Sequence, residues 1–289
     1  MIRVHGLEKN FRKSRVLNGL DLEIEEGERV ALVGANGAGK TTLIRCLLGE
    51  YVARGTVLVG GASPRERRAE TLHWVGFVPQ LPPPLRMPVG ELLHFAASLC
   101  ESEPARMESV AADLGLAIDP IRRQAFAKLS GGQKQKLLIA VALGRDSRLL
   151  IMDEPAANLD PDARRAFFQL LAESDQRTTM LISSHRLDEV ASLVNRVIEL
   201  DGGRVVLDDR VAETDSLTSM LRCRIRLVHP EKSVADTLTS WGFRSTGDML
   251  SFEGMVVGPD RLRFFGTLAR YSGLVATLTL EEISQDGNC

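Results

Sequence analysis

Apolar and polar residues alternate in three stretches near the start of the chain. Residues 2–4, 20–24 and 29–33 follow this pattern, which is typical of strands that bury one face. Glu26, Gly27 and Glu28 separate the last two stretches and predict a turn. The chain is therefore expected to begin with an antiparallel β layer.

Three later apolar runs are continuous rather than alternating. They occupy residues 75–78, 149–152 and 180–183. Continuous runs of this length are expected for strands that are covered on both faces of a sheet. Polar residues follow each run, and parallel α/β sheets bind their ligands at the carboxyl ends of their strands. These polar residues are therefore candidates for chemistry.

The apolar spacing becomes helical between Pro88 and Leu143. Leu92, Phe95 and Leu99 recur at intervals of three and four residues, as in an amphipathic helix. We therefore expect a helical insertion over about residues 88–143. It lies within a first, α/β domain that is predicted to span residues 1–212.

A smaller and different order of elements follows residue 212. Its pattern predicts strand, helix, strand, strand, helix and strand, which is the ferredoxin-like arrangement. The predicted strands occupy residues 222–228, 243–246, 249–257 and 274–280, and the predicted helices occupy residues 231–241 and 259–271. Residues 213–289 are therefore expected to form a small α+β accessory domain.

Composition and charge narrow the function classes. Lys and Arg total 36 against 38 Asp and Glu, so the formal charge of −2 provides no basic field to attract nucleic acid. The longest apolar run, residues 137–143, is far shorter than the roughly 18 residues that span a bilayer, and no charged-then-apolar leader opens the chain. We expect a chain that does not cross a membrane by itself.

The four cysteines indicate a reducing compartment. They lie far apart and show no paired spacing, so the sequence predicts neither a disulfide framework nor a zinc cluster. Free structural thiols in the cytoplasm are the interpretation that fits this pattern. The cysteines are Cys46, Cys100, Cys223 and Cys289.

A glycine-rich segment after the apolar stretch at residues 29–33 fits the pattern G-x-x-x-x-G-K-[ST]. It stands between a predicted strand and a predicted helix, which is the context that a phosphate-binding loop requires. Its backbone amides can surround phosphate oxygens, its lysine neutralises the β- and γ-phosphates, and the hydroxyl after the lysine can ligate magnesium. A glycine-rich turn that binds nothing is the alternative. The segment reads Gly34, Ala35, Asn36, Gly37, Ala38, Gly39, Lys40, Thr41, Thr42.

Two adjacent acids, Asp153 and Glu154, follow the buried run at residues 149–152. Burying two carboxylates without partners would cost several kcal/mol, so a cation or a reacting water should lie near them. Asp153 is the expected magnesium holder, and Glu154 is the expected base that polarises a water for attack on the γ-phosphate. Two helix-capping acids in an ordinary loop are the alternative.

A second motif, Ser130, Gly131, Gly132 and Gln133, follows Leu129 about ninety residues after the loop. It precedes an apolar helical run, so Ser130 is expected to cap a buried helix. The first turn of this helix carries Lys134 and Lys136 and no acid, although helices favour acids there. The positive helix end and the lysines predict a second anion-binding site, whereas an ordinary Ser-capped helix is the alternative.

In identity, order and spacing the motifs resemble those of the ATP-binding cassette (ABC) ATPases. The resemblance covers about residues 1–212. It implies a P-loop nucleotide-binding fold and a head-to-tail dimer, in which ATP with Mg²⁺ lies between the phosphate loop of one copy and the Ser130–Gln133 motif of the other. The matching positions are Gly34 to Thr42, Gln80, Leu129 to Gln133, Leu149 to Glu154, Asn158 to Asp160 and His185.

The resemblance also assigns roles to isolated residues. It implies that Gln80 senses magnesium and the attacking water, and that His185 holds the γ-phosphate and orients Glu154. Asp160 is expected to link the two ATP sites, and Phe11 to stack on adenine, with a core phenylalanine as the alternative. No catalytic position departs from the family pattern, so both sites of a homodimer are expected to hydrolyse ATP.

Transport is the expected use of this ATPase. One cassette and a short spacing between the motifs argue against the ribosome-acting factors, which usually carry two cassettes, and against the DNA-repair clamps, which insert a long coiled coil. The chain would then serve separate integral membrane subunits at the cytoplasmic face of the cell membrane. Contact is expected near residues 81–85, a stiff apolar segment that could otherwise be a rigid solvent loop.

A single cassette with a short extension resembles the ATPase subunits of ABC-2 type exporters. It is also loosely similar to the ATPase subunits that serve copper-site maturation of nitrous oxide reductase. Export is therefore the expected direction, and an importer ATPase is the alternative. The accessory domain is expected to strengthen or regulate dimerisation.

Overall fold

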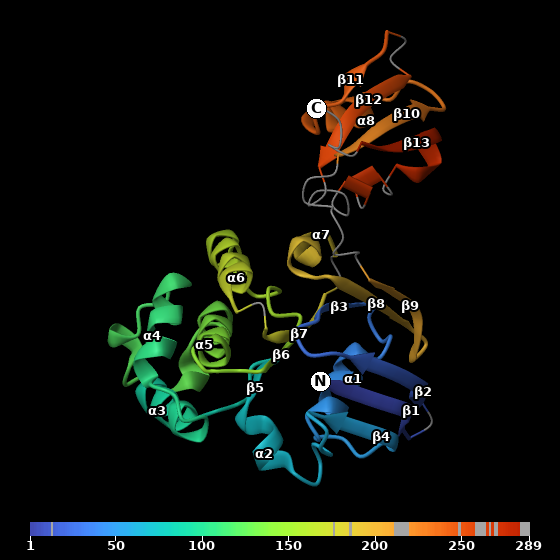
Figure 1. Ribbon diagram of the computed structural model, residues 1–289. Helices are drawn as coiled ribbons and strands as arrows, with labels where there is room; N and C mark the ends of the chain where they lie inside the picture. Colours follow the sequence, from blue (N-terminus) through green and yellow to red (C-terminus); the bar gives the residue numbers. More distant parts are fainter. Residues whose placement is uncertain are drawn as a thin grey trace, which may run out of the picture. The chain divides into compact units, whose positions relative to one another are not determined.

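The computed structural model describes residues 1–12, 14–175, 177–184, 187–210, 220–247, 250–257, 264–265, 267–268 and 271–283. The chain divides into two compact units (Figure 1). The first contains residues 1–186 and 193–211, and the second contains residues 187–192 and 212–289.

A six-stranded sheet forms the centre of the first unit. Neighbouring strands pair in parallel, except for the last two, which are antiparallel. Every residue of β6 and β7 is buried, which confirms that these continuous apolar runs are strands covered on both faces. The order is β5 (Val75–Val78), β6 (Leu149–Asp153), β7 (Thr179–Ser183), β3 (Arg29–Val33), β8 (Arg196–Asp201), β9 (Arg204–Arg210).

A three-stranded antiparallel sheet lies beside it and confirms the predicted β layer for residues 2–4 and 20–24, whereas residues 29–33, predicted with them, form β3 of the central sheet and pair in parallel. Its order is β2 (Ser14–Ile24), β1 (Ile2–Phe11) and β4 (Arg54–Val59). Helix α1 (Lys40–Leu47) buries Leu43, Ile44 and Leu47 in the core that the two sheets share. The alternating pattern identified only parts of β1 and β2, and it did not identify β4.

Three helices, α3 (Val89–Leu99), α4 (Pro104–Asp113) and α5 (Gly131–Leu143), pack around a core of their own. They occupy one side of the unit in Figure 1. Phe126 and Leu137 are fully buried in this core. The shorter α2 (Arg68–His73) precedes β5, and α6 (Pro161–Glu173) connects β6 to β7.

The second unit contains a four-stranded antiparallel sheet, with α8 (Lys232–Ser240) between its first two strands in sequence. Cys223, Ile225, Val234 and Phe252 belong to its core. The predicted order of strands is present, whereas most of the helix predicted at residues 259–271 lies outside the described residues. The sheet order is β11 (Arg244–Ser245), β12 (Ser251–Val257), β10 (Met220–Leu227), β13 (Val275–Ile283); the short α7 (Leu187–Val190) also belongs to this unit.

Candidate nucleotide site

The glycine-rich loop connects the carboxyl end of β3 to the start of α1. Gly34 has φ +142°, and a Cβ there would lie 2.3 Å from the Leu200 carbonyl oxygen, so only glycine fits. Gly39 has φ +110° at the start of α1. No side chain caps this helix and no acid lies in its first turn, so its amides remain suited to an anion.

Lys40 lies folded against the loop and is only 7% exposed. Its Nζ donates hydrogen bonds to the carbonyl oxygens of Gly34 at 2.7 Å and Ala35 at 3.4 Å. The same Nζ lies 3.8 Å from Oε1 of Glu154, which comes from the end of β6. The loop cation and the candidate base therefore face the same space.

The hydroxyl of Ser183 connects the two candidate acids. It donates to Oδ1 of Asp153 at 2.7 Å and accepts from the backbone N–H of Glu154 at 3.0 Å. Asp153 is 2% exposed, so this hydrogen bond stabilises a buried carboxyl group. Glu154 has φ +48°, a conformation that a non-glycine residue rarely adopts and that concentrates at functional sites.

Sequence reasoning assigned no role to Ser183. Its position at the carboxyl end of β7, next to β6, was the available signal, because neighbouring parallel strands bring their ends to one edge. Asp153 and Ser183 are in fact register partners across these two strands.

A pocket of about 310 Å³ brings most of the predicted residues together. Gln80 reaches it from the segment after β5, and Glu154 from the turn after β6. Val16 of β2 also lines it and was not identified from the sequence. The lining residues are Val16, Ala35, Asn36, Gly37, Gly39, Lys40, Thr41, Thr42, Gln80 and Glu154.

Phe11, a described residue at the end of β1, does not line this pocket. Its ring is 39% exposed, and its centroid lies 5.2 Å from that of Tyr51 in an edge-on arrangement. The Lys9 ammonium lies 4.7 Å from the centre of the Phe11 ring. Phe11 is thus a surface aromatic rather than a core residue, and its contact with adenine stays a prediction.

The donor groups at the site fit magnesium. Thr41 supplies a hydroxyl, Gln80 an amide oxygen and Asp153 a carboxylate, and Mg²⁺ prefers such oxygen ligands while retaining several waters. Among the described residues, no group of three or more His, Cys, Asp or Glu side chains could hold a metal ion. This arrangement fits an ion that is bound together with phosphate oxygens.

Ser130 caps helix α5, as the sequence predicts, and Gln133 completes a capping box with it. The amide of Gln133 donates to Oγ of Ser130 at 3.2 Å, and the amide of Ser130 donates to Oε1 of Gln133 at 3.0 Å. A Cβ on Gly132 would lie 3.3 Å from the Asn158 carbonyl oxygen, whereas one on Gly131 would meet nothing within 4 Å. All four motif residues are described, and none lines the pocket at Lys40.

Lys136, one of the two lysines expected to attract an anion, has a partner within the chain. Its Nζ forms an ion pair with Oδ2 of Asp160 at 2.8 Å, so this cation is already engaged within the chain. Asp160 also caps α6, since its Oδ1 accepts from the amide of Ala163 at 2.9 Å. The Ala163 amide and Lys136 together lower the pKa of Asp160 to about 2. Asp160 therefore connects the start of α5 to the start of α6, and its link between two ATP sites stays a prediction.

His185 follows β7 but lies outside the described residues. Its contact with the γ-phosphate and with Glu154 therefore stays a prediction.

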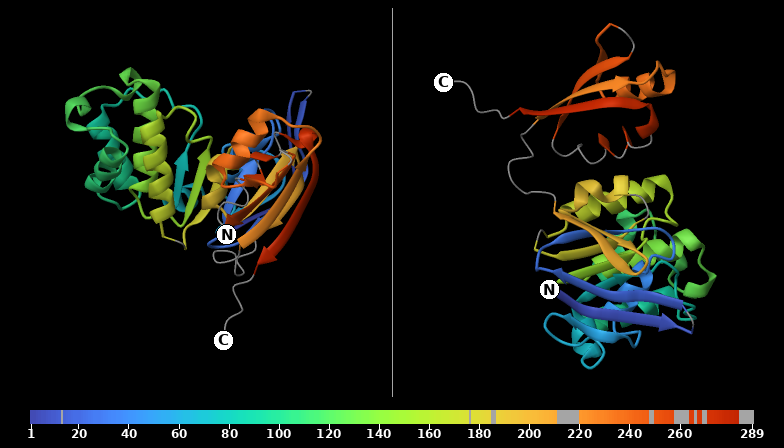
Figure 2. Two further views of the ribbon diagram at one scale, coloured as in Figure 1. Left: turned by 90° about the horizontal axis from the view of Figure 1, so that it is seen from above. Right: turned by 90° about the vertical axis from the view of Figure 1, so that its right-hand side faces the viewer.

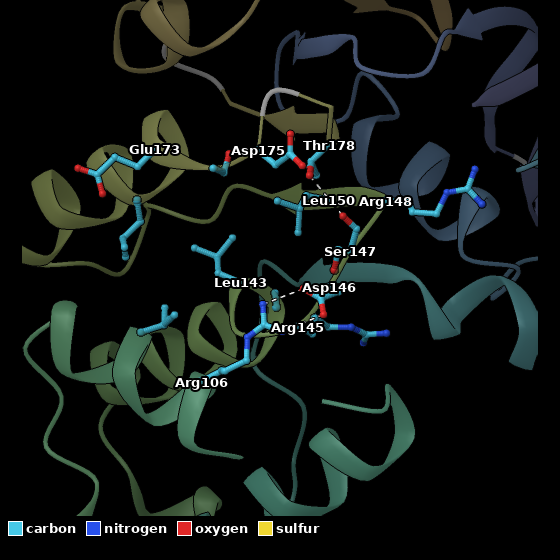
Figure 3. Close-up of a pocket in the computed structure, with 14 residues that line it drawn as sticks. Arg106, Leu143, Arg145, Asp146, Ser147, Arg148, Leu150, Glu173, Asp175 and Thr178 are labelled. Carbon is cyan, nitrogen blue, oxygen red and sulfur yellow. Dashed lines mark hydrogen bonds and ion pairs between the residues drawn. The ribbon is translucent and has the colours of Figure 1, made fainter. Parts of the chain in front are cut away.

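A larger pocket, of about 500 Å³, lies at the ends of α5 and α6 and next to α4 (Figure 3). Arg106 and Asp146 form a two-pronged ion pair at its edge, with N–O distances of 2.7 and 2.8 Å. None of the predicted site residues lines it. Pocket volume therefore does not identify the nucleotide site. The glycine-rich loop, Lys40 and the two acids do.

Comparison with known proteins decides the family. The profile of the ABC transporter family matches residues 17–157. The aliphatic sulfonates import ATP-binding protein SsuB 1 of Nocardia farcinica is 36% identical over 213 residues, which cover 73% of this chain and 82% of that protein. The chain belongs to the ABC transporter ATP-binding proteins. It is therefore an ATPase that binds ATP with Mg²⁺.

Other ABC proteins resemble the chain over different lengths. The Nod factor export ATP-binding protein I of Cupriavidus metallidurans is 32% identical over 262 residues, 87% of this chain and 86% of that protein. The solved cassette MJ0796, a dimer bound to ADP and phosphate, shares the fold with a TM-score of 0.65 and 22% identity, covering 73% of this chain and 99% of its own. The described helices of this ABC protein include none long and apolar enough to span a bilayer.

Proposed function

We propose that the chain is the ATPase subunit of an exporter and hydrolyses ATP between two of its copies. One observation carries this proposal: Lys40, Gln80 and Glu154 surround one pocket, while the Ser130–Gln133 motif lies outside it. A second copy would supply that motif. Gly131, Gly132 and the positive end of α5 would then complete the phosphate site.

The residues of the pocket then have distinct roles. Lys40 and the amides of the glycine-rich loop bind the phosphates, and Glu154 accepts a proton from the attacking water. Ser183 holds the backbone of Glu154 and the carboxyl group of Asp153 in place. Bound Mg²⁺, held by Thr41, Asp153 and Gln80, would neutralise charge that develops on the phosphates.

Export is supported by the share of this chain over which the export protein resembles it. The similarity to the Nod factor export protein covers 87% of this chain, whereas the similarities to the sulfonate import protein and to the methionine import ATP-binding protein MetN of Rhizobium johnstonii cover 73% and 80%. An importer ATPase remains the alternative, because the sulfonate import protein is more identical than the export protein. The finer assignment, to an ABC-2 type exporter, rests on the resemblance of the small α+β unit that follows this cassette.

Membrane subunits would dock next to Gln80, at the cytoplasmic face of the membrane. Leu81 is 73% exposed directly after Gln80, and the neighbouring prolines stiffen the segment. Phe95 on α3 is also exposed. An apolar contact at this place could transmit movement to the residue that senses magnesium and water.

The substitution Glu154→Gln tests the assigned base. It should lower ATP turnover by roughly 10²–10⁴-fold, the usual contribution of a general base, while ATP binding changes little. Glu173→Gln, at an exposed position of α6, is the matched control and should leave turnover unchanged. Normal turnover in the Glu154 variant would contradict the assignment.

Purification of the full chain with its native partners tests the transport role. An integral membrane protein should co-purify, and its kind would show the direction of transport. Recovery with ribosomes or DNA instead would exclude the proposed function.

A further inference from the structure

Strand β13 forms a long open edge of the sheet in the second unit. It has nine residues and pairs with β10 on one side, and no described strand pairs with its other side. The opposite edge is formed by β11, which has only two residues. The red strand in Figure 2 is this edge. Such an edge presents a row of unpaired backbone donors and acceptors to another strand.

Two exposed leucines distinguish this edge. Leu278 and Leu280 are 39% and 44% exposed. Their register partners on β10, Ile225 and Cys223, are buried in the core of the unit, and directly opposed residues share a face. The apolar face of the sheet therefore continues past β10 onto β13 and is incompletely covered there.

The edge carries little of the usual protection against pairing, since Glu281 and Glu282 near its end are the only charged residues in the strand. Natural edge strands are commonly blocked by lysine, proline or a bulge. The segment from Val275 to Ile283 contains no lysine, arginine or proline. Its only register shift with β10 lies near Val275, at the first residue.

We propose that β13 pairs antiparallel with β13 of a second copy, in a register centred on Thr279. Thr279 is the middle of the nine residues, so this register pairs the whole strand. It sets Leu278 opposite Leu280 of the other copy, twice by symmetry, and Thr277 opposite Glu281. Each acidic position faces a non-acidic one.

Neighbouring registers fit less well. Moving the centre to Leu280 would set Leu278 opposite Glu282 and Thr279 opposite Glu281, and it would shorten the ladder. Opposed apolar pairs stabilise a sheet, and a leucine opposite an acid does not. Moving the centre to Leu278 would set Val275 opposite Glu281 and would also shorten the ladder. Of these three registers, the one centred on Thr279 pairs the whole strand and sets neither leucine nor valine opposite an acid.

This contact needs no nucleotide, which separates it from the proposed ATP-dependent dimer of the cassettes. Two contacts within one pair of chains strengthen each other, because the first brings the second to a high effective concentration. The strand pair would keep two copies together between rounds of hydrolysis. It stands on β13 alone, so its failure would leave the proposed ATPase function intact.

Disulfide formation in the full chain tests the register. Thr279→Cys, in a background with Cys100→Ser and Cys289→Ser, should give a cross-linked dimer under mild oxidation without ATP. Opposed residues in an antiparallel pair have Cα atoms roughly 4.5–5.5 Å apart, which a disulfide spans. Of the remaining cysteines, Cys46 and Cys223 are buried, and burial raises the pKa of Cys46 to about 11, so they should not react.

Thr277→Cys is the matched control, two residues from the axis on the same strand. Two copies of residue 277 would lie four positions apart, about 14 Å, so this variant should not cross-link with itself. When Thr277→Cys is mixed with a Glu281→Cys chain, a disulfide should link one chain of each variant, because these two positions are directly opposed. Equal self-linking of both single variants, or none at Thr279→Cys, would overturn the proposal.

Sedimentation of the nucleotide-free full chain provides the second measurement. The unmodified chain should sediment as a dimer, and Leu278→Lys with Leu280→Lys should give a monomer, since the register sets lysine opposite lysine. ATP binding by the double variant should stay within about twofold of the unmodified chain, which also shows that it is folded. An unmodified chain that is monomeric without nucleotide would refute the contact.

Discussion

Ser183 is the residue on which the geometry of both acids depends. Its hydroxyl donates to Asp153 and accepts from the backbone of Glu154. Loss of a hydrogen bond to a buried charged group costs about 1.5–3 kcal/mol, which corresponds to roughly a tenfold to hundredfold change in rate. We predict such a decrease in turnover for Ser183→Ala.

Measuring both turnover and ATP affinity distinguishes a role of Ser183 in positioning the acids from a role in ATP binding. The variant should lose turnover while its Kd for ATP changes little, because the loop and Lys40 are untouched. Ser183→Thr keeps the hydroxyl and should retain more turnover than Ser183→Ala. Ser98→Ala, on the exposed side of α3, serves as the control. A decrease in ATP affinity that accounts for the whole effect would contradict the positioning role.

The carboxyl group of Asp160 makes stability depend on pH in a defined direction. Its pKa is lowered from 3.8 to about 2, so the ionised form stabilises the folded state at every pH above about 4. This contribution is lost as the pH falls towards 2. We predict that Asp160→Asn, which keeps a capping group but loses the pair with Lys136, lowers the urea midpoint at pH 5–8.

The pH series supplies the check for Asp160. The difference between the unmodified chain and Asp160→Asn should shrink below pH 4 and should be constant above pH 5. Asp162→Asn, at an exposed neighbour that pairs with Arg165 one turn along α6, should show a smaller difference. A difference that persists unchanged at pH 3 would exclude Asp160 as its source.

At the scale of elements, strands and loops were predictable where their pattern was local. The runs at β6 and β7 are continuous and apolar, and Ser130 before an apolar helical run indicates a helix cap. Strand β4 was missed because its first three residues, Arg54, Gly55 and Thr56, are exposed and carry little apolar signal. The pair of Lys136 with Asp160 joins two helix starts that are 24 positions apart, so no local pattern could reveal it.

The segment after β5 leads to a prediction about assembly. Leu81→Asp places a charge on a side chain that is 73% exposed, so the fold and the basal ATPase activity should change little. Burying that charge against a membrane subunit would cost several kcal/mol, and the membrane protein should be lost during co-purification. Val206→Asp, on exposed β9, is the control. Undiminished co-purification of the Leu81 variant would contradict docking at this segment.

At the scale of the whole molecule, the sequence predicted the fold class and most of the pocket but not the order of strands. The order β5, β6, β7, β3, β8, β9 joins segments from the start, middle and end of the first unit. Those pairings are long-range, and they place Ser183 beside Asp153. Val16 reaches the same pocket from β2 of the three-stranded sheet. The motifs were recognisable because each one is short and has its chemistry within a few residues.

If each ATP site is shared between two copies, a mixture of two inactive variants should regain ATPase activity. Lys40→Ala removes the phosphate-binding cation, and Ser130→Glu sets an acid where the γ-phosphate of the partner site is expected, so each variant alone should be inactive. In a mixture, half of the dimers contain both variants, and each of these has one intact site. Turnover should then recover to about a quarter of the unmodified level if the two sites act independently.

This mixture distinguishes a shared ATP site from two self-contained sites. Recovery requires Lys40 from one chain and Ser130 from the other to act on the same ATP, which two self-contained sites could not achieve. Lys40→Ala mixed with Glu154→Gln is the control, because both changes fall on the same half of the site and no combination contains an intact one. Equal recovery in the two mixtures, or none in either, would contradict an ATP site shared between copies.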